Sequence, residues 1–174
     1  TVISGPVEIP APKCNKLIKV ISAQEMYEKT ISELPADVVI CTAAVADWKL
    51  IPEKQNNQNI SIANKIKKTN HNLKFITIKN PDILENISKS NNRPKIVIGF
   101  SAETENVIEN AKSKLLSKKL DLILANDVSD NKVFGKNINK VYLISKYTCE
   151  EWSEQSKISV ASNLANRIHE MLLA

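Results

Sequence analysis

Short apolar runs alternate with stretches of helical periodicity along most of the chain. The runs are rich in β-branched residues and show no regular polar alternation, which is typical of strands covered on both faces. Residues 74–78 instead alternate between polar and apolar positions, as a half-buried strand does. We therefore predict strands at residues 17–21, 38–42, 74–78, 96–100, 120–125 and 141–145.

Helix signals follow most of these runs. Ser22, with Glu25 three residues later, predicts a helix start, and Pro35 ends that helix. Asn80 and Pro81 supply an N-cap and a first-turn proline for a second helix that runs to about residue 89. Two further helices are expected at about residues 105–119 and at the end of the chain. Their predicted core-facing residues are Val107, Ile108, Ala111, Leu115 and Leu116 in the first, and Ala161, Leu164, Ile168 and Leu172 in the second.

This alternation predicts an α/β fold in a single domain of residues 1–174. The expected architecture is Rossmann-like and doubly wound, with a mainly parallel sheet and helices on both faces. The stretch from about residue 49 to 72 is rich in Asn and Lys and lacks periodicity, so we expect a long flap after the second strand. Ligands of such folds bind beyond the carboxyl ends of the strands, which directs attention to the residues after Cys41, Phe100 and Ala125.

The charge distribution favours an anionic partner. The net charge is +5, and residues 54–81 contain six lysines and no acid: Lys54, Lys65, Lys67, Lys68, Lys74 and Lys79. A solvated lysine-rich loop would also explain this segment. A nucleic acid is a weaker explanation, because the segment has no arginine and no interleaved aromatic residues. A small phosphorylated ligand fits better.

Composition excludes several other classes of protein. No apolar run has the ~20 residues of a membrane span, and there is no signal-peptide pattern, so we expect a cytoplasmic protein. The three cysteines, Cys14, Cys41 and Cys149, lie far apart and lack zinc-ligand spacing. We expect them to be reduced thiols.

Two segments at predicted strand ends carry candidate chemistry. In residues 42–48, TAAVADW, small side chains would let a ligand approach the backbone, and Asp47 could meet a ribose hydroxyl or a metal; alternatively the alanines only pack and Asp47 caps a turn. In residues 99–104, GFSAET, a base could stack on Phe100 beside a helix N-terminus that receives phosphate, or Phe100 is a core residue.

Two lysines on the following helix form a further candidate. Lys114 and Lys118 form a like-charge pair on one face, which a polyanion would relieve. A merely solvated face is the alternative.

Together with four further motifs, these segments resemble one family. The order is SGP (4–6), TAAVADW (42–48), KIKK (65–68), KNPDIL (79–84), GFSAET (99–104) and AKSKLLSKKLDLILANDV (111–128). The chain resembles bacterial CTP-dependent phosphopantothenate–cysteine ligase, also called phosphopantothenoylcysteine synthetase, over nearly its whole length. In many bacteria this ligase is the C-terminal domain of a bifunctional synthetase/decarboxylase flavoprotein.

The resemblance implies a reaction of coenzyme A biosynthesis. CTP activates the carboxylate of 4′-phosphopantothenate as an acyl-cytidylate, and L-cysteine then displaces CMP. The resemblance also implies Mg²⁺, a homodimer, no flavin in this segment and Lys65 as the catalytic lysine, with Lys54 as the second choice. The nucleotide-contacting residues that it implies are Thr42, Ala43, Asp47, Lys65, Pro81, Asp82, Ile83, Leu84, Phe100, Lys114 and Lys118.

The start of the chain departs from the family pattern. Family members open with a strand, a glycine-containing phosphate loop and an asparagine for the second half-reaction, whereas this chain begins at Thr1, near the end of the second family strand. We therefore expect an N-terminally truncated ligase domain that is a poor catalyst on its own. Two alternatives stay open: a nucleotide-binding fragment without activity, and a truncated Rossmann NAD(P) oxidoreductase.

Overall fold

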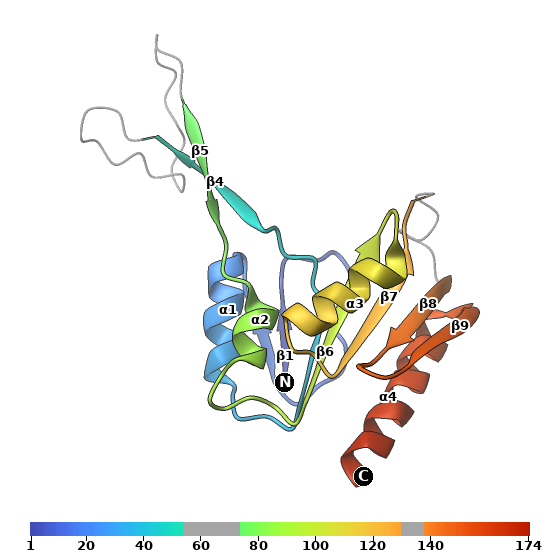
Figure 1. Ribbon diagram of the computed structural model, residues 1–174. Coiled ribbons are helices and arrows are strands. Elements are labelled where there is room, and N and C mark those ends of the chain that lie inside the picture. Colours follow the sequence, from blue (N-terminus) through green and yellow to red (C-terminus); the bar gives the residue numbers. More distant parts are fainter. Residues whose placement is uncertain (54–73, 130–137) are drawn as a thin grey trace. The chain divides into compact units, whose positions relative to one another are not determined.

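The computed structural model describes residues 1–53, 74–129 and 138–174 (Figure 1). These residues form two compact parts. The smaller part consists of the described residues of Thr1–Thr30 and Ala43–Asp82, and the larger part consists of those of Ile31–Thr42 and Ile83–Ala174. The candidate lysines Lys54 and Lys65 lie outside the described residues.

A five-stranded sheet with the strand order β3-β6-β7-β8-β9 forms the centre of the larger part. Its strands are β3 (Val38–Cys41), β6 (Ile96–Glu103), β7 (Leu122–Asp127), β8 (Ile138–Ile144) and β9 (Cys149–Ser156). The pairings β3–β6 and β6–β7 are parallel, whereas β7–β8 and β8–β9 are antiparallel. The sheet is therefore mixed, and the prediction of a mainly parallel sheet is only partly right.

The two antiparallel pairings come from the end of the chain. A tight turn, in which Ser145 N donates to the Thr148 carbonyl at 2.9 Å, reverses the chain between β8 and β9. The sequence prediction missed β9 because its residues, CEEWSEQS, contain no apolar run. The strand β9 forms because it pairs with β8, and its own sequence carries no strand pattern.

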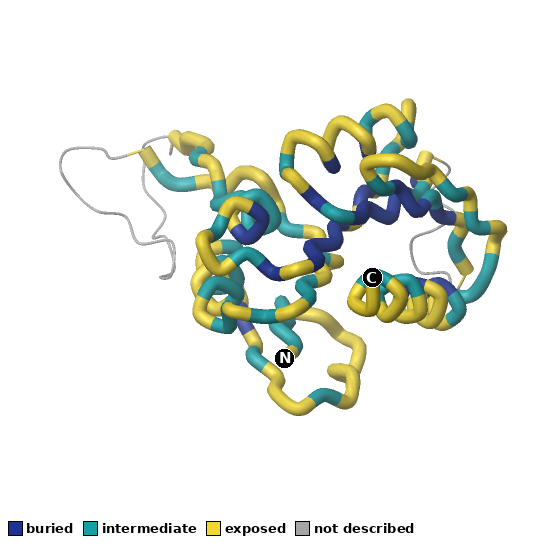
Figure 2. The backbone as a smooth tube through the Cα atoms, turned by 60° about the horizontal axis from the view of Figure 1, so that its bottom comes forward, coloured by how far each residue is buried: buried dark blue, intermediate teal, exposed yellow. Residues whose placement is uncertain are grey.

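Helices cover both faces of this sheet, as predicted. On one face, Val97 and Ile123 belong to the same core as residues of α2 (Ile83–Ser88) and α3 (Val107–Ser117). On the other face, Ile98 and Leu122 pack in a second core with α4 (Lys157–Leu173). Alternating side chains of one strand thus belong to two different cores. The buried positions in Figure 2 follow the central strands.

Details of the helix faces differ from the prediction. Leu116 of α3 is 63% exposed and Leu172 of α4 is 44% exposed, although both were expected to face the core. Ala161 is also exposed. The inward residues of α4 are Val160, Leu164, Ile168 and Met171, a stripe that begins one residue before the predicted one.

The smaller part contains two separate pairs of strands. The strands β1 (Val2–Ser4) and β2 (Leu17–Lys19) are parallel, and α1 (Ala23–Ser32) follows them. The predicted start of α1 is confirmed, because Ser22 Oγ accepts from Glu25 N at 3.2 Å while Glu25 Oε2 accepts from Ile21 N at 2.9 Å.

The second pair is an antiparallel ribbon of β4 (Trp48–Pro52) and β5 (Phe75–Lys79). Its existence corrects two predictions. Residues 49–52 are a strand and not the start of an unpatterned flap, and the predicted strand at 74–78 pairs with β4 and not with the main sheet. The rest of the expected flap lies outside the described residues. No helix of the described chain is long and apolar enough to cross a membrane.

One polar clamp joins the amino ends of β6 and β7. Asp121 Oδ2 accepts from Val97 N and from Arg93 Nη2, both at 2.7 Å, and Arg93 Nη2 also donates to the Lys119 carbonyl at 3.1 Å. The Asp121 carboxylate, which lies just before β7, thus accepts a hydrogen bond from a backbone N–H near the start of β6. Both charged side chains are about two-thirds shielded from solvent, with 29% and 31% exposed.

We predict that Asp121→Asn lowers the free energy of unfolding by about 1–3 kcal/mol, because it weakens a charge-assisted bond and leaves the guanidinium without its counter-charge. Asp37→Asn is the matched control. Asp37 pairs with Lys95 at 2.9 Å, but both side chains are more than 70% exposed, so the loss should stay within about 0.5 kcal/mol. Urea unfolding of both variants measures the difference, and equal losses would contradict the assigned role of Asp121.

Candidate functional site

The carboxyl end of β6 extends beyond its neighbour β3. Cys41, the last residue of β3, pairs with Gly99, so Thr42 and Phe100 follow at the same end of the sheet. From Phe100 to Glu103, β6 pairs with β7. Within the described residues of the larger part, the other edge of β6 has no strand partner beyond Gly99. Ligands of α/β folds bind beyond this end of the sheet, which is why these residues are candidates.

Phe100 is a strand residue and does not stand beside a helix N-terminus. The strand continues through Glu103, because Ala102 and Glu103 pair with Asn126 and Asp127, and α3 begins only at Val107. This corrects the expected geometry of residues 99–104. Successive side chains of a strand point to opposite faces, so Phe100, which is 37% exposed, points away from the α3 face. A nucleotide that contacts both Phe100 and α3 has to pass around the end of the sheet.

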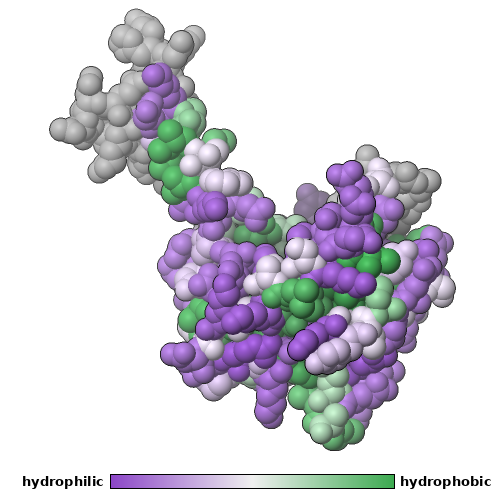
Figure 3. Space-filling view, in the orientation of Figure 1, coloured by the Kyte–Doolittle hydropathy of each residue, from purple (hydrophilic) through white to green (hydrophobic). Residues whose placement is uncertain are grey.

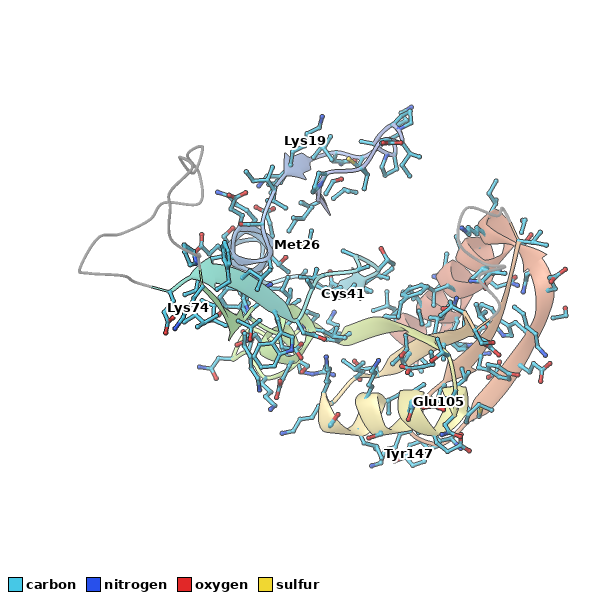
Figure 4. All side chains as sticks on the ribbon, turned by 90° about the horizontal axis from the view of Figure 1, so that it is seen from above. Lys19, Met26, Cys41, Lys74, Glu105 and Tyr147 are labelled. Atoms are coloured by element: carbon cyan, nitrogen blue, oxygen red, sulfur yellow. The ribbon has the colours of Figure 1, made fainter. Side chains whose placement is uncertain are left out.

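A polar cluster lies on the α3 face of this strand end, and we call Ser101, Glu103, Asn110 and Lys114 the Glu103 cluster. Lys114 Nζ donates to Glu103 Oε1 at 2.6 Å and to Ser101 Oγ at 3.1 Å. Ser101 Oγ also donates to Glu103 Oε1, and Asn110 Nδ2 reaches Glu103 Oε2 at 3.4 Å. Figure 4 labels Glu105, which lies in the short connection between β6 and α3.

Glu103 stays ionised in this environment. Partial burial raises the pKa of its carboxyl, but the hydrogen bonds from Lys114 and Ser101, the charge of Lys114 and the bond from Asn110 outweigh burial, so the net pKa is lowered. The cluster therefore contains a carboxylate and an ammonium in direct contact. Sequence reasoning missed Glu103, because it is eleven positions from Lys114 and the two residues belong to different elements, a strand and a helix, whose packing the sequence alone does not give.

The Glu103 contact also corrects the interpretation of the two lysines on α3. Lys114 already has a counter-charge in the chain, so no polyanion is required to relieve a repulsion with Lys118. Lys118 follows the last residue of α3 as its C-cap, and its backbone N–H donates to the Lys114 carbonyl at 3.0 Å.

In the smaller part, the structure brings together two of the predicted segments. Asn80 N donates to the Asp47 carbonyl, and Asn80 Nδ2 donates to the Ala46 carbonyl, both at 2.8 Å. The end of TAAVADW is therefore joined to the residues that precede Pro81 and Asp82. Asn80 does not cap α2, which begins at Ile83, two residues later than predicted.

The following turn is fixed by close packing on β6. A Cβ atom on Gly99 would lie 2.9 Å from both Leu84 Cδ2 and Leu120 Cδ1, so only glycine leaves the present space for Leu84. Ile83 and Leu84 both pack against the core of the larger part. Their side chains therefore have a structural role.

The described residues contain no preformed metal centre. In residues 1–53, 74–129 and 138–174, no group of three or more His, Cys, Asp or Glu side chains could hold a metal ion. Mg²⁺ that travels with a triphosphate needs only one or two protein carboxylates, since phosphates and water supply the other ligands. Asp47, the residue that the sequence offers for a metal or a ribose, is exposed.

Comparison with known proteins identifies relatives of this chain. Residues 1–172 match the family model described as DNA/pantothenate metabolism flavoprotein C-terminal domain. The chain belongs to this family. It is 38% identical over 171 residues to the coenzyme A biosynthesis bifunctional protein CoaBC of Haemophilus influenzae, with 98% of this chain and 41% of that protein covered. The protein of the same name from Borreliella burgdorferi is 39% identical over 167 residues, with 94% and 40% covered.

Solved structures of the family have the same fold. The crystal structure of the C-terminal domain of a coenzyme A biosynthesis bifunctional protein CoaBC superposes with a TM-score of 0.73 at 30% identity, and covers 98% of this chain and 72% of that domain. The DNA/pantothenate metabolism flavoprotein of Streptococcus pneumoniae gives the same TM-score at 19% identity, with 97% and 79% covered, which supports the fold alone. The chain spans about two fifths of the length of the curated relatives.

Proposed function

We propose that this chain supplies the nucleotide side of a phosphopantothenate–cysteine ligase that uses CTP. The observation that carries the proposal is the match of residues 1–172 to a family with relatives in coenzyme A biosynthesis. The end of β6 supports it, because Phe100 lies there and Lys114 bonds to Ser101 and Glu103, and α/β folds bind nucleotides at the carboxyl ends of their strands.

The proposed reaction has two steps. A carboxylate oxygen of 4′-phosphopantothenate attacks the α-phosphorus of CTP, the bond to the β-phosphate breaks, and pyrophosphate leaves. The amine of L-cysteine then attacks the acyl carbon of the acyl-cytidylate, loses a proton and displaces CMP, which leaves phosphopantothenoylcysteine.

Each predicted site residue has a part in this reaction. Phe100 stacks on the base and Asp47 meets the ribose or Mg²⁺, while the small Thr42 and Ala43 let the nucleotide approach the backbone. The turn at residues 81–84 offers backbone groups. Lys65, Lys114 and Lys118 neutralise the phosphates, and Mg²⁺ would supply further positive charge there.

The two alternatives are separated from this proposal in different ways. The oxidoreductase alternative loses its support, since the family match covers nearly the whole chain. A nucleotide-binding fragment without activity differs from a ligase only in turnover. A fused decarboxylase stays a proposal as well, and the mass of the natural gene product tests it.

We predict that the intact gene product releases pyrophosphate from CTP only when 4′-phosphopantothenate is present. Parallel assays with CTP and ATP measure the nucleotide preference, and addition of L-cysteine should convert the product into phosphopantothenoylcysteine and CMP. Release that is driven equally by an unrelated acid, or no release with either nucleotide, would contradict the ligase assignment.

Lys65→Ala in the intact gene product should slow formation of the acyl-cytidylate by roughly ten- to a hundredfold. A charged hydrogen bond to the developing phosphate charge is worth about 1.5–3 kcal/mol, and each ~1.4 kcal/mol is a factor of ten in rate. Single-turnover formation of the cytidylate measures this loss, with Lys54→Ala as the control that should change little. A larger loss at Lys54 would move the catalytic role to that residue, and a large fall in melting temperature at Lys65 would make its role structural.

We further propose that the ribbon of β4 and β5 pairs with a second copy of the chain. An isolated two-stranded ribbon is marginally stable in water. Trp48, Leu50 and Phe75 share one face of this ribbon by their register and are 52%, 63% and 47% exposed. The ribbon carries apolar colour in Figure 3, and a homodimer would bury this face.

Leu50→Lys should therefore weaken the dimer at least tenfold, because a buried unpaired charge opposes association. Light scattering over a concentration series measures the dissociation constant. Ile21→Lys is the control, because Ile21 lies after β2 and is 81% exposed. It should leave the dissociation constant unchanged. A monomeric parent protein, or an unaltered dimer in Leu50→Lys, would show that this ribbon is not the interface.

A further inference from the structure

The Glu103 cluster holds an ammonium group at two points while leaving part of it in contact with solvent. Lys114 Nζ bonds to Glu103 Oε1 and to Ser101 Oγ, and the lysine side chain is 46% exposed. An ammonium has three donors, so these bonds leave one donor for another acceptor. An anion can therefore bind Lys114 without displacing Glu103.

Glu103 is itself fixed more firmly than Lys114. Its side chain is only 14% exposed, and its two oxygens accept hydrogen bonds from Ser101, Lys114 and Asn110. Ser101 is a buried residue of β6, whereas Asn110 belongs to α3 and also donates to the Glu105 carbonyl at 3.0 Å. The carboxylate is thus tied to both elements that frame the strand end.

We propose that Glu103 is a positioning residue that holds the Lys114 ammonium ready for the phosphates of a nucleoside triphosphate. The identity of this ligand rests on the proposed function. Glu103 acts through Lys114 and does not touch the ligand. A lysine side chain loses rotamer freedom when it binds, and a lysine that is already held in place loses less.

A carboxylate beside an anion site can also weaken binding of the anion. Its negative charge repels the phosphates, so electrostatics alone predicts that neutralising Glu103 strengthens binding. Positioning predicts weaker binding. Glu103→Gln separates the two roles by sign, because glutamine keeps the size of the side chain and can still accept a hydrogen bond from Ser101.

We expect Glu103→Gln to weaken binding of Mg²⁺–CTP to the intact gene product by about tenfold, because a neutral amide holds the Lys114 ammonium less firmly than a carboxylate does. Calorimetric titration measures this constant. The control is Glu109→Gln, an exposed acid in the first turn of α3 that gives the same change in net charge, and it should alter affinity by less than about twofold. Unchanged or tighter binding in Glu103→Gln would overturn the positioning role.

A double-mutant cycle tests whether Glu103 acts through Lys114. In a Lys114→Met background, Glu103→Gln should weaken CTP binding no further, since the group that it positions is absent. The double variant should also melt at or above the temperature of Lys114→Met, because a shielded carboxylate without its partner has been removed. Additive losses of affinity would show that Glu103 works independently of Lys114. Glu103→Asp keeps the charge but shortens the reach, and it gives the answer if Glu103→Gln fails to fold.

A readout without nucleotide keeps this inference separate from the proposed function. Acetylation with limiting N-hydroxysuccinimide acetate, followed by peptide mass spectrometry, gives the reactivity of Lys114 relative to the exposed Lys112. The ratio should be low in the parent protein and should rise several-fold in Glu103→Gln. If the ratio rises but the parent protein binds no CTP, the proposed function fails and the positioning stands. If CTP binds and neither the ratio nor the affinity changes in Glu103→Gln, the positioning fails.

Discussion

The pairing of β6 is the constraint on which the larger part depends. Residues Ile96 to Gly99 pair with β3, and residues Ile98 to Glu103 pair with β7. Strand partners satisfy the backbone groups of this segment, so its side chains can be buried on both faces. The cores under α3 and α4 both begin from its alternating residues. The helices that cover the sheet are therefore placed by one strand.

The same strand changes from core to site along one face. Val97, Gly99, Ser101 and Glu103 follow one another on the α3 side and are apolar, small, polar and charged in turn. Helix α3 shows the same change, since Ala111 and Leu115 are buried while Asn110 and Lys114 reach the Glu103 carboxylate. Rigid, packed elements thus bring the polar cluster to the end of the sheet, and little freedom is left to its side chains.

Much of the fold could be predicted from the sequence because its signals are local. Apolar runs predicted β3, β6 and β7, and the Ser22 and Glu25 pattern predicted the start of α1. What could not be predicted depends on partners distant in the chain. The strand β9 is polar and forms by pairing with β8, and β5 reads as a strand in isolation although only its partner β4 decides which sheet it joins. Likewise, the family motif predicted Lys114 as a nucleotide-contacting residue, but its contact with Glu103 arises only when α3 packs on β6.

The two kinds of lysine in the proposed site differ in where their counter-charge comes from. Lys114 has a carboxylate within 2.6 Å in the same chain, so part of its electrostatic interaction exists before any ligand binds. Lys65 belongs to residues 54–81, in which the sequence contains no acid, and we expect the ligand to supply its counter-charge. Interactions that exist equally in the ground state and the transition state favour binding, whereas those that grow as charge develops favour the rate. Under the proposed function, we therefore infer that Lys114 contributes mainly to nucleotide affinity, because it is held in place before the nucleotide binds.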